Sequence, residues 1–247
     1  MRTLECCVDT LEAARNAIAG GANRIELCGN LIIGGTTPSA YLYEAIRRES
    51  SVEIRAMIRP RYGDFLYTES ELDIMEAEIR QFRQMGCNGV VFGVLTADGG
   101  LDRTAMARLR EAAGEMKATL HRAFDVTADP FDALETARQL GMDTILTSGQ
   151  KQNAGEGAAL IGELVARSGE IEILVGSGVS AEVISALGAS TGARSFHLSG
   201  RVEEDSPMVY RKPEISMGLP GISEYARWNC STEKIAAARK ALDNLTD

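Results

Sequence analysis

The sequence predicts a (β/α)8 barrel formed by a single domain over residues 1–247. Three observations lead to this fold class: the chain length of 247 residues, eight short apolar runs, and helical segments between them. Barrels of this kind fill such a length as one unit. Eight strands that alternate with helices favour a closed parallel barrel over an open sheet.

The eight expected strands are short runs rich in apolar and β-branched residues. They lie at 3–7, 24–28, 53–59, 89–95, 117–123, 144–149, 171–178 and 194–200. Strand spacing of this regularity, with a helical pattern in each interval, is typical of repeated βα units.

Helix starts carry recognisable capping residues. TESE at 68–71 is a capping box, in which Thr68 and Glu71 each satisfy a free backbone N–H, and apolar residues then recur at helical spacing. Asp129 and Pro130 form an N-cap and first helical residue, and Ser180 caps a further helix. The segment 201–221 is too long for a simple connection, and we expect it to fold over or beside the barrel mouth.

Composition excludes several function classes. The formal net charge is −9 and no Lys/Arg run interrupts it, so a nucleic-acid partner is not expected. No stretch approaches the ~20 apolar residues that span a bilayer. The five cysteines form an odd set without CxxC spacing, which favours reduced thiols over disulfides or a zinc ribbon. We therefore expect a cytoplasmic protein without a membrane partner.

Strand register places polar side chains inside the barrel, because alternate residues face opposite sides and the helix-facing side should be apolar. Glu5, Arg24 and Arg55 lie early in their strands, where a buried ion network that fixes the fold is the favoured interpretation. Residues later in their strands lie where barrel enzymes build their sites. These are Glu26, Arg59, His121 and His197.

The loops after the strands add candidate ligand-binding groups. RPRYGDF at 59–65 offers two arginine forks suited to a carboxylate, phosphate or polyol, although exposed arginines paired with acids would look the same. Small residues after strands six to eight would let a ligand approach the backbone, or would simply form turns. The predicted ligand-binding residues are Arg59, Arg61, Asp64, Arg122, Ser148, Gly149, Gly176, Gly178, His197 and Ser199.

HRAFD at 121–125 suggests acid–base chemistry. His121 could act as acid or base, with Asp125 or Glu26 orienting it and Arg122 at the rim. These three residues, His121, Glu26 and Asp125, are the predicted catalytic group. The reaction type is not specified by this pattern, since no HExxH or nucleophile motif accompanies it.

Soft metal donors also face the barrel interior. Cys7, Cys28 and Met57 lie on three consecutive strands, and thiolates and thioethers are the donors that select Cu(I). Buried cysteines that act as small apolar residues explain the same pattern, and from chemistry alone that interpretation is favoured.

Several motifs together resemble the copper homeostasis protein CutC family. They are LECC, RIELCGNLIIGGTTPS, MIRPRYGDFLYTESE, HRAFD, LTSGQK, GSGV, FHLSG and the late SPMVYR and SMG, and they run from Leu4 to about Gly218. The resemblance implies a cytoplasmic (β/α)8 barrel, often dimeric, with a role in copper handling. It places Glu26 and Cys28, Arg59, Arg61 and Asp64, His121, Arg122 and Asp125, and Ser148, Gly149 and His197 in family motifs, without an established catalytic set.

Two functions follow from different classes. One is copper binding in homeostasis, with Cu(I) held by Cys7, Cys28 and Met57, in a protein that forms dimers. The other is a barrel enzyme that acts on a small anionic or sugar-phosphate metabolite, with His121 as acid or base and Arg59 and Arg61 as clamps. A module that binds the same metabolite without changing it is a variant of the second.

Overall fold

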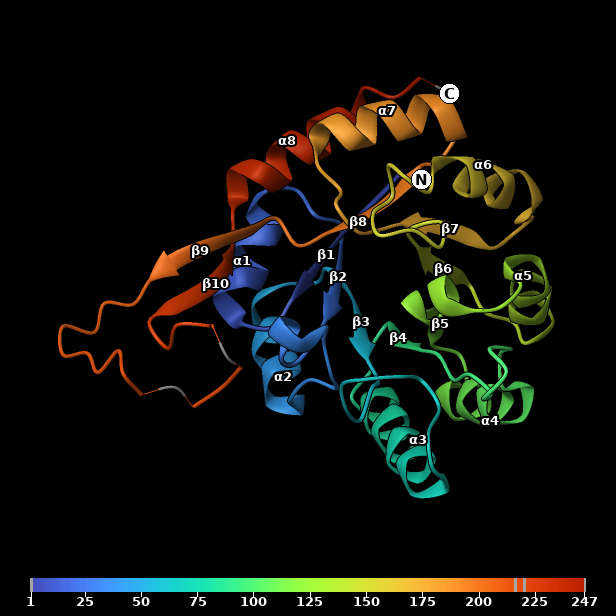
Figure 1. Cartoon of the computed structure of the whole chain (residues 1–247), viewed down its shortest axis with the longest axis horizontal. Helices are drawn as coiled ribbons and strands as arrows, with labels where there is room; N and C mark the ends of the chain where they lie inside the picture. Colours follow the sequence, from blue (N-terminus) through green and yellow to red (C-terminus); the bar gives the residue numbers. More distant parts are fainter. Residues whose placement is uncertain (1, 216, 220, 247) are drawn as a thin grey trace.

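Eight parallel strands close into a barrel, as the sequence predicts. The computed structural model describes residues 2–215, 217–219 and 221–246. Strands follow one another around the barrel in chain order, and the last pairs with the first (Figure 1). They are β1 (Thr3–Val8), β2 (Arg24–Leu27), β3 (Glu53–Met57), β4 (Gly89–Phe92), β5 (Lys117–Leu120), β6 (Thr144–Thr147), β7 (Glu172–Val175) and β8 (Ser195–Leu198).

Helices surround the barrel. They are α1 (Leu11–Ala19), α2 (Ala40–Glu49), α3 (Glu69–Gln84), α4 (Arg103–Ala113), α5 (Pro130–Gln139), α6 (Ala158–Arg167), α7 (Ala181–Thr191) and α8 (Thr232–Asp243), with short 3-10 turns at Leu31–Ile33 and Arg122–Val126. The capping box of Thr68 and Glu71 begins α3, and Asp129 and Ser180 cap α5 and α7, as predicted. Within the described ranges, no helix has the length and apolar character needed to cross a bilayer.

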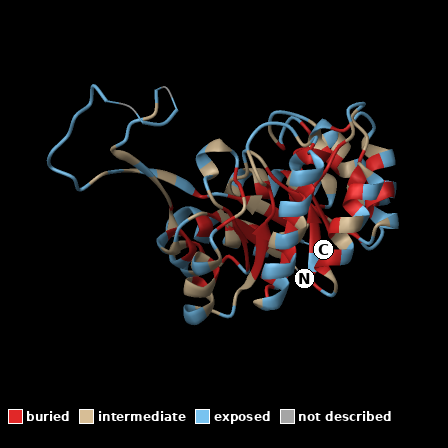
Figure 2. Cartoon of the chain, turned by 90° about the horizontal axis from the view of Figure 1, so that it is seen from below, coloured by how far each residue is buried: buried red, intermediate tan, exposed pale blue. Residues whose placement is uncertain are grey.

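The expected alternation along the strands holds. Leu4, Ile25, Ile54 and Phe196 are fully buried in the apolar layer between strands and helices. Figure 2 shows this buried layer running through the barrel, while the outer faces of the helices are exposed. The opposite face of the strands lines the barrel interior and carries the polar residues, because side chains alternate along a strand.

The segment after β8 does not fold over the mouth. β9 (Arg201–Asp205) pairs with β10 (Ala226–Cys230) in an antiparallel ribbon, and the connecting loop extends away from the barrel (Figure 1). Of the two expected positions for 201–221, over or beside the mouth, the described residues of the loop do not take the first, and residues 216 and 220 lie outside the described part. Among the described residues, the base of the ribbon takes the second position, beside the mouth, where Arg201 stacks over Trp228 at 4.1 Å and both line a pocket with Cys7.

Candidate functional site

The lower layer of the barrel interior is an ion network. Arg24 donates to Glu5 at 2.5 Å and to Glu172 at 2.8 Å, and Arg55 donates to Thr119 and Thr144. Burial by itself would raise the pKa of Glu5, but Arg24 and a hydrogen bond from His197 outweigh burial and lower this pKa to about 2. The early-strand residues thus form the buried ion network that their position predicts.

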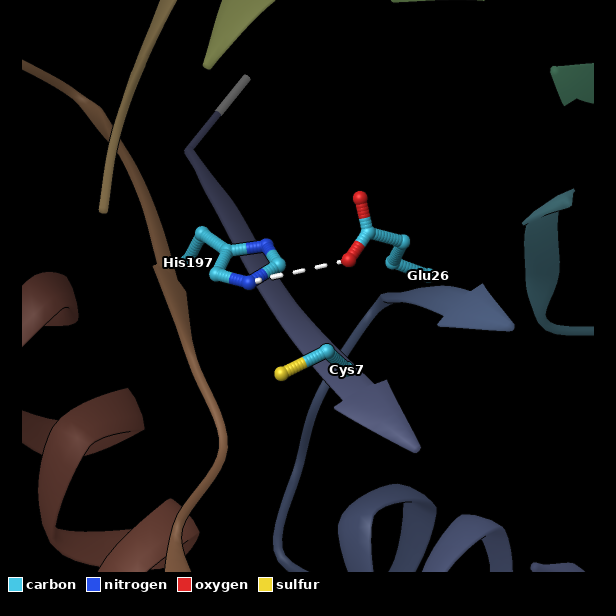
Figure 3. A group of neighbouring side chains, drawn as sticks. All are labelled: Cys7, Glu26 and His197. Carbon is cyan, nitrogen blue, oxygen red and sulfur yellow. Dashed lines mark ion pairs between the residues drawn. The ribbon is translucent and has the colours of Figure 1, made fainter. Parts of the chain in front are cut away.

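Above this network, three donor atoms from adjacent strands converge. Cys7 on β1, Glu26 on β2 and His197 on β8 each offer one ligand atom, and these atoms all lie within 4.8 Å of one another (Figure 3). Cys7 and Glu26 are register partners, and His197 is the partner of Glu5, two residues earlier on β1. The barrel register therefore brings a sulfur, a nitrogen and an oxygen donor together.

Glu5, in the lower layer of the barrel interior, orients the His197 ring. Its Nδ1 lies 2.8 Å from Glu5 Oε1, and its Nε2 lies 3.8 Å from Glu26 Oε2. A carboxylate at Nδ1 can only accept, so Nδ1 carries a proton. Burial favours a lower pKa for His197, but the neighbouring Cys7, Glu26 and Glu5 outweigh burial and raise this pKa well above its ordinary value. Nε2 is the nitrogen directed at Glu26 and Cys7.

Glu26 is buried with one oxygen occupied and one free. Oε2 accepts from the Cys28 thiol at 3.5 Å, whereas Oε1 has no hydrogen-bond partner. Burial raises the pKa of Glu26. Burial and the adjacent Glu26 carboxylate also raise the pKa of Cys28 well above its usual value.

The three predicted soft donors lie in one small apolar cluster. Cys28 and Met57 pack with Val91, and Cys7 and Leu31 lie against them. Cys7 and Met57 also line the mouth cavity. The structure thus brings the thiol and thioether groups together, beside Glu26 and His197.

His121 is deeply buried at the mouth. Its Nδ1 accepts from the backbone N–H of Ala123 at 3.2 Å, and its Nε2 has no partner. Burial, and then the positive charge of Arg59, lower the pKa of His121 to about 3. Near neutral pH it is therefore an uncharged hydrogen-bond donor, which differs from the acid–base role that the sequence suggests.

Arg59 holds three loop carbonyls instead of a carboxylate. Its guanidinium donates to the carbonyls of Gly34, Gly35 and Gly63 and lies over the Phe65 ring at 5.2 Å. The Phe65 ring in turn contacts the His121 ring, with centroids 4.8 Å apart. The Nε of Arg59 is buried without a partner.

These groups line one cavity of about 220 Å³ at the carboxyl end of the barrel. Its walls include apolar residues that sequence reasoning did not single out, although Phe65 lies inside the RPRYGDF motif. The lining residues are Cys7, Glu26, Leu31, Gly34, Met57, Arg59, Phe65, His121, Arg122, Leu146 and His197.

Two predicted ligand or catalytic groups, Arg61 and Asp125, are occupied by partners within the protein and do not themselves line this cavity. Arg61 pairs with Glu71 at 2.6 Å and with Asp64 at 3.1 Å, and Asp64 is exposed. Asp125 accepts from the backbone N–H groups of Ser148 and Gln150 and pairs with Arg122. Asp125 thus holds the 147–150 loop and has no hydrogen bond to His121, so the proposed orientation of His121 by Asp125 was wrong.

The small residues of the loops mainly permit close packing. A Cβ on Gly149 would lie 2.4 Å from the Gly157 carbonyl, and one on Gly176 would lie 2.6 Å from Leu146. Gly178 has a φ of +69°, which side chains rarely adopt. Ser148 bonds Asp125 and Arg122. Ser199 lines a neighbouring pocket beside the ribbon base.

Fold and site together define a (β/α)8 barrel protein with a thiol, an imidazole and a buried carboxylate grouped at its mouth. The sequence model of the CutC family matches residues 2–202. A Chromobacterium violaceum protein named family protein CutC is 42% identical over 243 residues, which cover 98% of each chain.

Two further relatives agree with this match. The mouse copper homeostasis protein cutC homolog is 41% identical over 225 residues, 90% of this chain and 83% of the mouse protein. A crystal structure of CutC from Streptococcus agalactiae has 33% identity and a TM-score of 0.76, and the match covers 81% of this chain and 99% of that one. The chain belongs to the CutC family.

Proposed function

We propose that this protein serves copper homeostasis by binding Cu(I) at the barrel mouth, with Cys7 Sγ and His197 Nε2 as the principal ligands. The observation that carries the proposal is the convergence of these atoms and Glu26 within 4.8 Å (Figure 3). The names of the relatives, which include copper homeostasis proteins, support the same function.

The chemistry of the donors supports copper. Thiolates select Cu(I), and imidazole is a good copper ligand. Cys28 and Met57 add a second thiol and a thioether in the same cluster. Glu26 contributes a hard oxygen, which suits Zn²⁺ better than Cu(I), so a comparison with zinc belongs in the test.

The contact between Glu5 and His197 supports a ligand role for the imidazole. Histidines that bind metals commonly donate their other ring N–H to a carboxylate, which fixes the ring and increases its basicity. Glu5 Oε1, 2.8 Å from His197 Nδ1, meets this requirement. Glu5 is in turn fixed by Arg24, so the ligand rests on a rigid support.

The test is an anaerobic Cu(I) competition titration against a chromogenic chelator, with reduced protein. Cys7→Ser and His197→Gln should each weaken Cu(I) binding by more than the roughly 10–100-fold typical of losing a group that only orients a ligand. Cys28→Ser should have a smaller effect. Cys87→Ser is the matched control, because Cys87 is also buried but bonds the carbonyls of Ile54 and Gly89.

Two results would contradict the proposal. If Cys7→Ser binds Cu(I) as tightly as Cys87→Ser does, the Cys7 thiolate is not a copper ligand. If Zn²⁺ binds more tightly than Cu(I) and its binding depends on Glu26, the site is a zinc site and not a copper site.

The proposal includes a cytoplasmic, dimeric protein. All five cysteines are free thiols, which suits a reducing compartment. The ribbon loop carries exposed apolar side chains, including Met208, Val209 and Tyr210, and such groups support association of two copies. Light scattering should give twice the chain mass of 26.5 kDa, and the monomer mass alone would contradict the dimer.

A further inference from the structure

Three residues that line the mouth cavity each have a buried polar atom with no hydrogen-bond partner among the described residues. The atoms are Arg59 Nε, His121 Nε2 and Glu26 Oε1. Their side chains are at most 8% exposed. Buried polar groups in proteins are nearly always hydrogen-bonded, so three unpartnered ones on residues that line a single cavity indicate a ligand.

The hydrogen-bonding state of each atom is defined by its surroundings. His121 Nδ1 accepts from Ala123 N, so the neutral ring carries its proton on Nε2 and donates there. Arg59 Nε is always a donor, and Glu26 Oε1 can accept. The three lining residues therefore provide two unpaired donors and one unpaired acceptor.

The charges restrict the ligand further. Among the residues that the structure describes, Arg59 makes no ion pair with a carboxylate, and its other nitrogens bond backbone carbonyls. A buried charge without a counter-ion is unfavourable, so an anion beside Arg59 would be stabilised. Glu26 in the same cavity disfavours a dianion such as phosphate, which leaves a ligand with one negative charge.

We propose that this cavity binds a small hydroxy acid. Its carboxylate accepts from Arg59 Nε and His121 Nε2, and its hydroxyl donates to Glu26 Oε1. A cavity of about 220 Å³, equal to roughly seven water molecules, has room for an acid of three or four carbons. The two residues that bind the carboxylate, Arg59 and His121, are not among the proposed copper ligands.

Calorimetric titration of the metal-free, chelator-treated full chain tests the proposal. Glycerate is the probe, and propionate and inorganic phosphate are compared with it. Glycerate should bind more tightly than either. His121→Asn keeps an acceptor for Ala123 N but removes the Nε2 donor, and Arg59→Met removes the charge. Each should weaken glycerate binding by about tenfold or more, because a hydrogen bond to an ionised group is lost.

A matched control distinguishes the loss of the Arg59 charge at the cavity from the structural effect of removing an arginine that bonds loop carbonyls. Arg110 also donates to backbone carbonyls, those of Gly114 and Gly141, and does not line the cavity. Arg110→Met should bind glycerate like the unaltered chain. If Arg59→Met fails to fold, His121→Asn still decides the question.

Three results would overturn the proposal. Glycerate that does not bind in the millimolar range would show that the cavity is not a hydroxy-acid site. Phosphate binding tighter than glycerate binding would exclude a monocarboxylate ligand. Glycerate affinity unchanged in His121→Asn would exclude the donor role of the imidazole. Copper binding does not enter this test, so its failure would leave the hydroxy-acid site untouched.

Discussion

The two polar layers inside the barrel differ in how completely their groups are paired. In the lower layer Arg24 forms ion pairs with both Glu5 and Glu172, and one nitrogen of Arg24 has no hydrogen-bond partner among the described residues. At the mouth, Arg59, His121 and Glu26 each keep a buried atom without a partner. Polar residues inside a barrel thus serve stability where they satisfy one another, and are available to ligands where they do not.

Breaking the lower layer should have the largest effect on stability. Arg24→Met leaves the buried Glu5 and the partly buried Glu172 without their shared cation, and should lower the free energy of unfolding by about 3–5 kcal/mol, measured in urea. Arg15→Met is the control, because the pair of Arg15 with Glu49 is exposed and its loss should cost less than about 1 kcal/mol. Equal losses in the two variants would contradict the structural role of the lower layer.

Asp125 sharpens the comparison, since it lies at the rim but is fully paired. It accepts from the backbone of Ser148 and Gln150 and pairs with Arg122. Asp125→Asn should therefore lower the free energy of unfolding by about 2–3 kcal/mol. A variant as stable as the unaltered chain would show that Asp125 does not hold the 147–150 loop.

His121 predicts a smaller, pH-dependent effect. Its pKa is about 3 in the folded chain, below the unfolded value, so the unfolded state binds more protons as the pH falls below about 6.5. The contribution of His121 is thus fully present above that pH and is lost on acidification. Between about pH 7 and about pH 5.5, His121→Asn should lose about 1 kcal/mol less stability than the unaltered chain.

Chemical unfolding at both pH values measures this difference. The change in unfolding free energy with pH is compared between the two chains, so the contributions of all other titrating groups, which both chains share, cancel. Parallel pH profiles for the two chains would mean that folding does not lower the pKa of His121.

The fold could be predicted from the sequence because each βα unit has a local signal. Strand runs alternate, and capping residues such as Thr68 and Asp129 mark helix starts. The ribbon after β8 could not be predicted, because its pairing of Arg201–Asp205 with Ala226–Cys230 joins segments separated by a long loop without periodicity.

The residues of the site were predictable one by one, but their grouping was not. Alternation shows that Cys7, Glu26 and His197 face the barrel interior, yet their meeting depends on the register of β8 against β1. The facing of the Arg61 side chain could not be predicted at all. β3 ends at Met57, and beyond a strand the alternation of side chains no longer determines which way a residue points. Phe65 was missed because an aromatic residue in a loop gives no distinct signal.

One paired measurement tests the division of the barrel interior most directly. Unfolding free energy and Cu(I) affinity are both measured for Arg55→Met, in the lower layer, and Cys7→Ser, at the mouth. Arg55→Met should lose stability and keep Cu(I) affinity, because Arg55 bonds only Glu53, Thr119 and Thr144 among its described contacts. Cys7→Ser should keep stability and lose affinity. Loss of both properties in both variants would contradict the account.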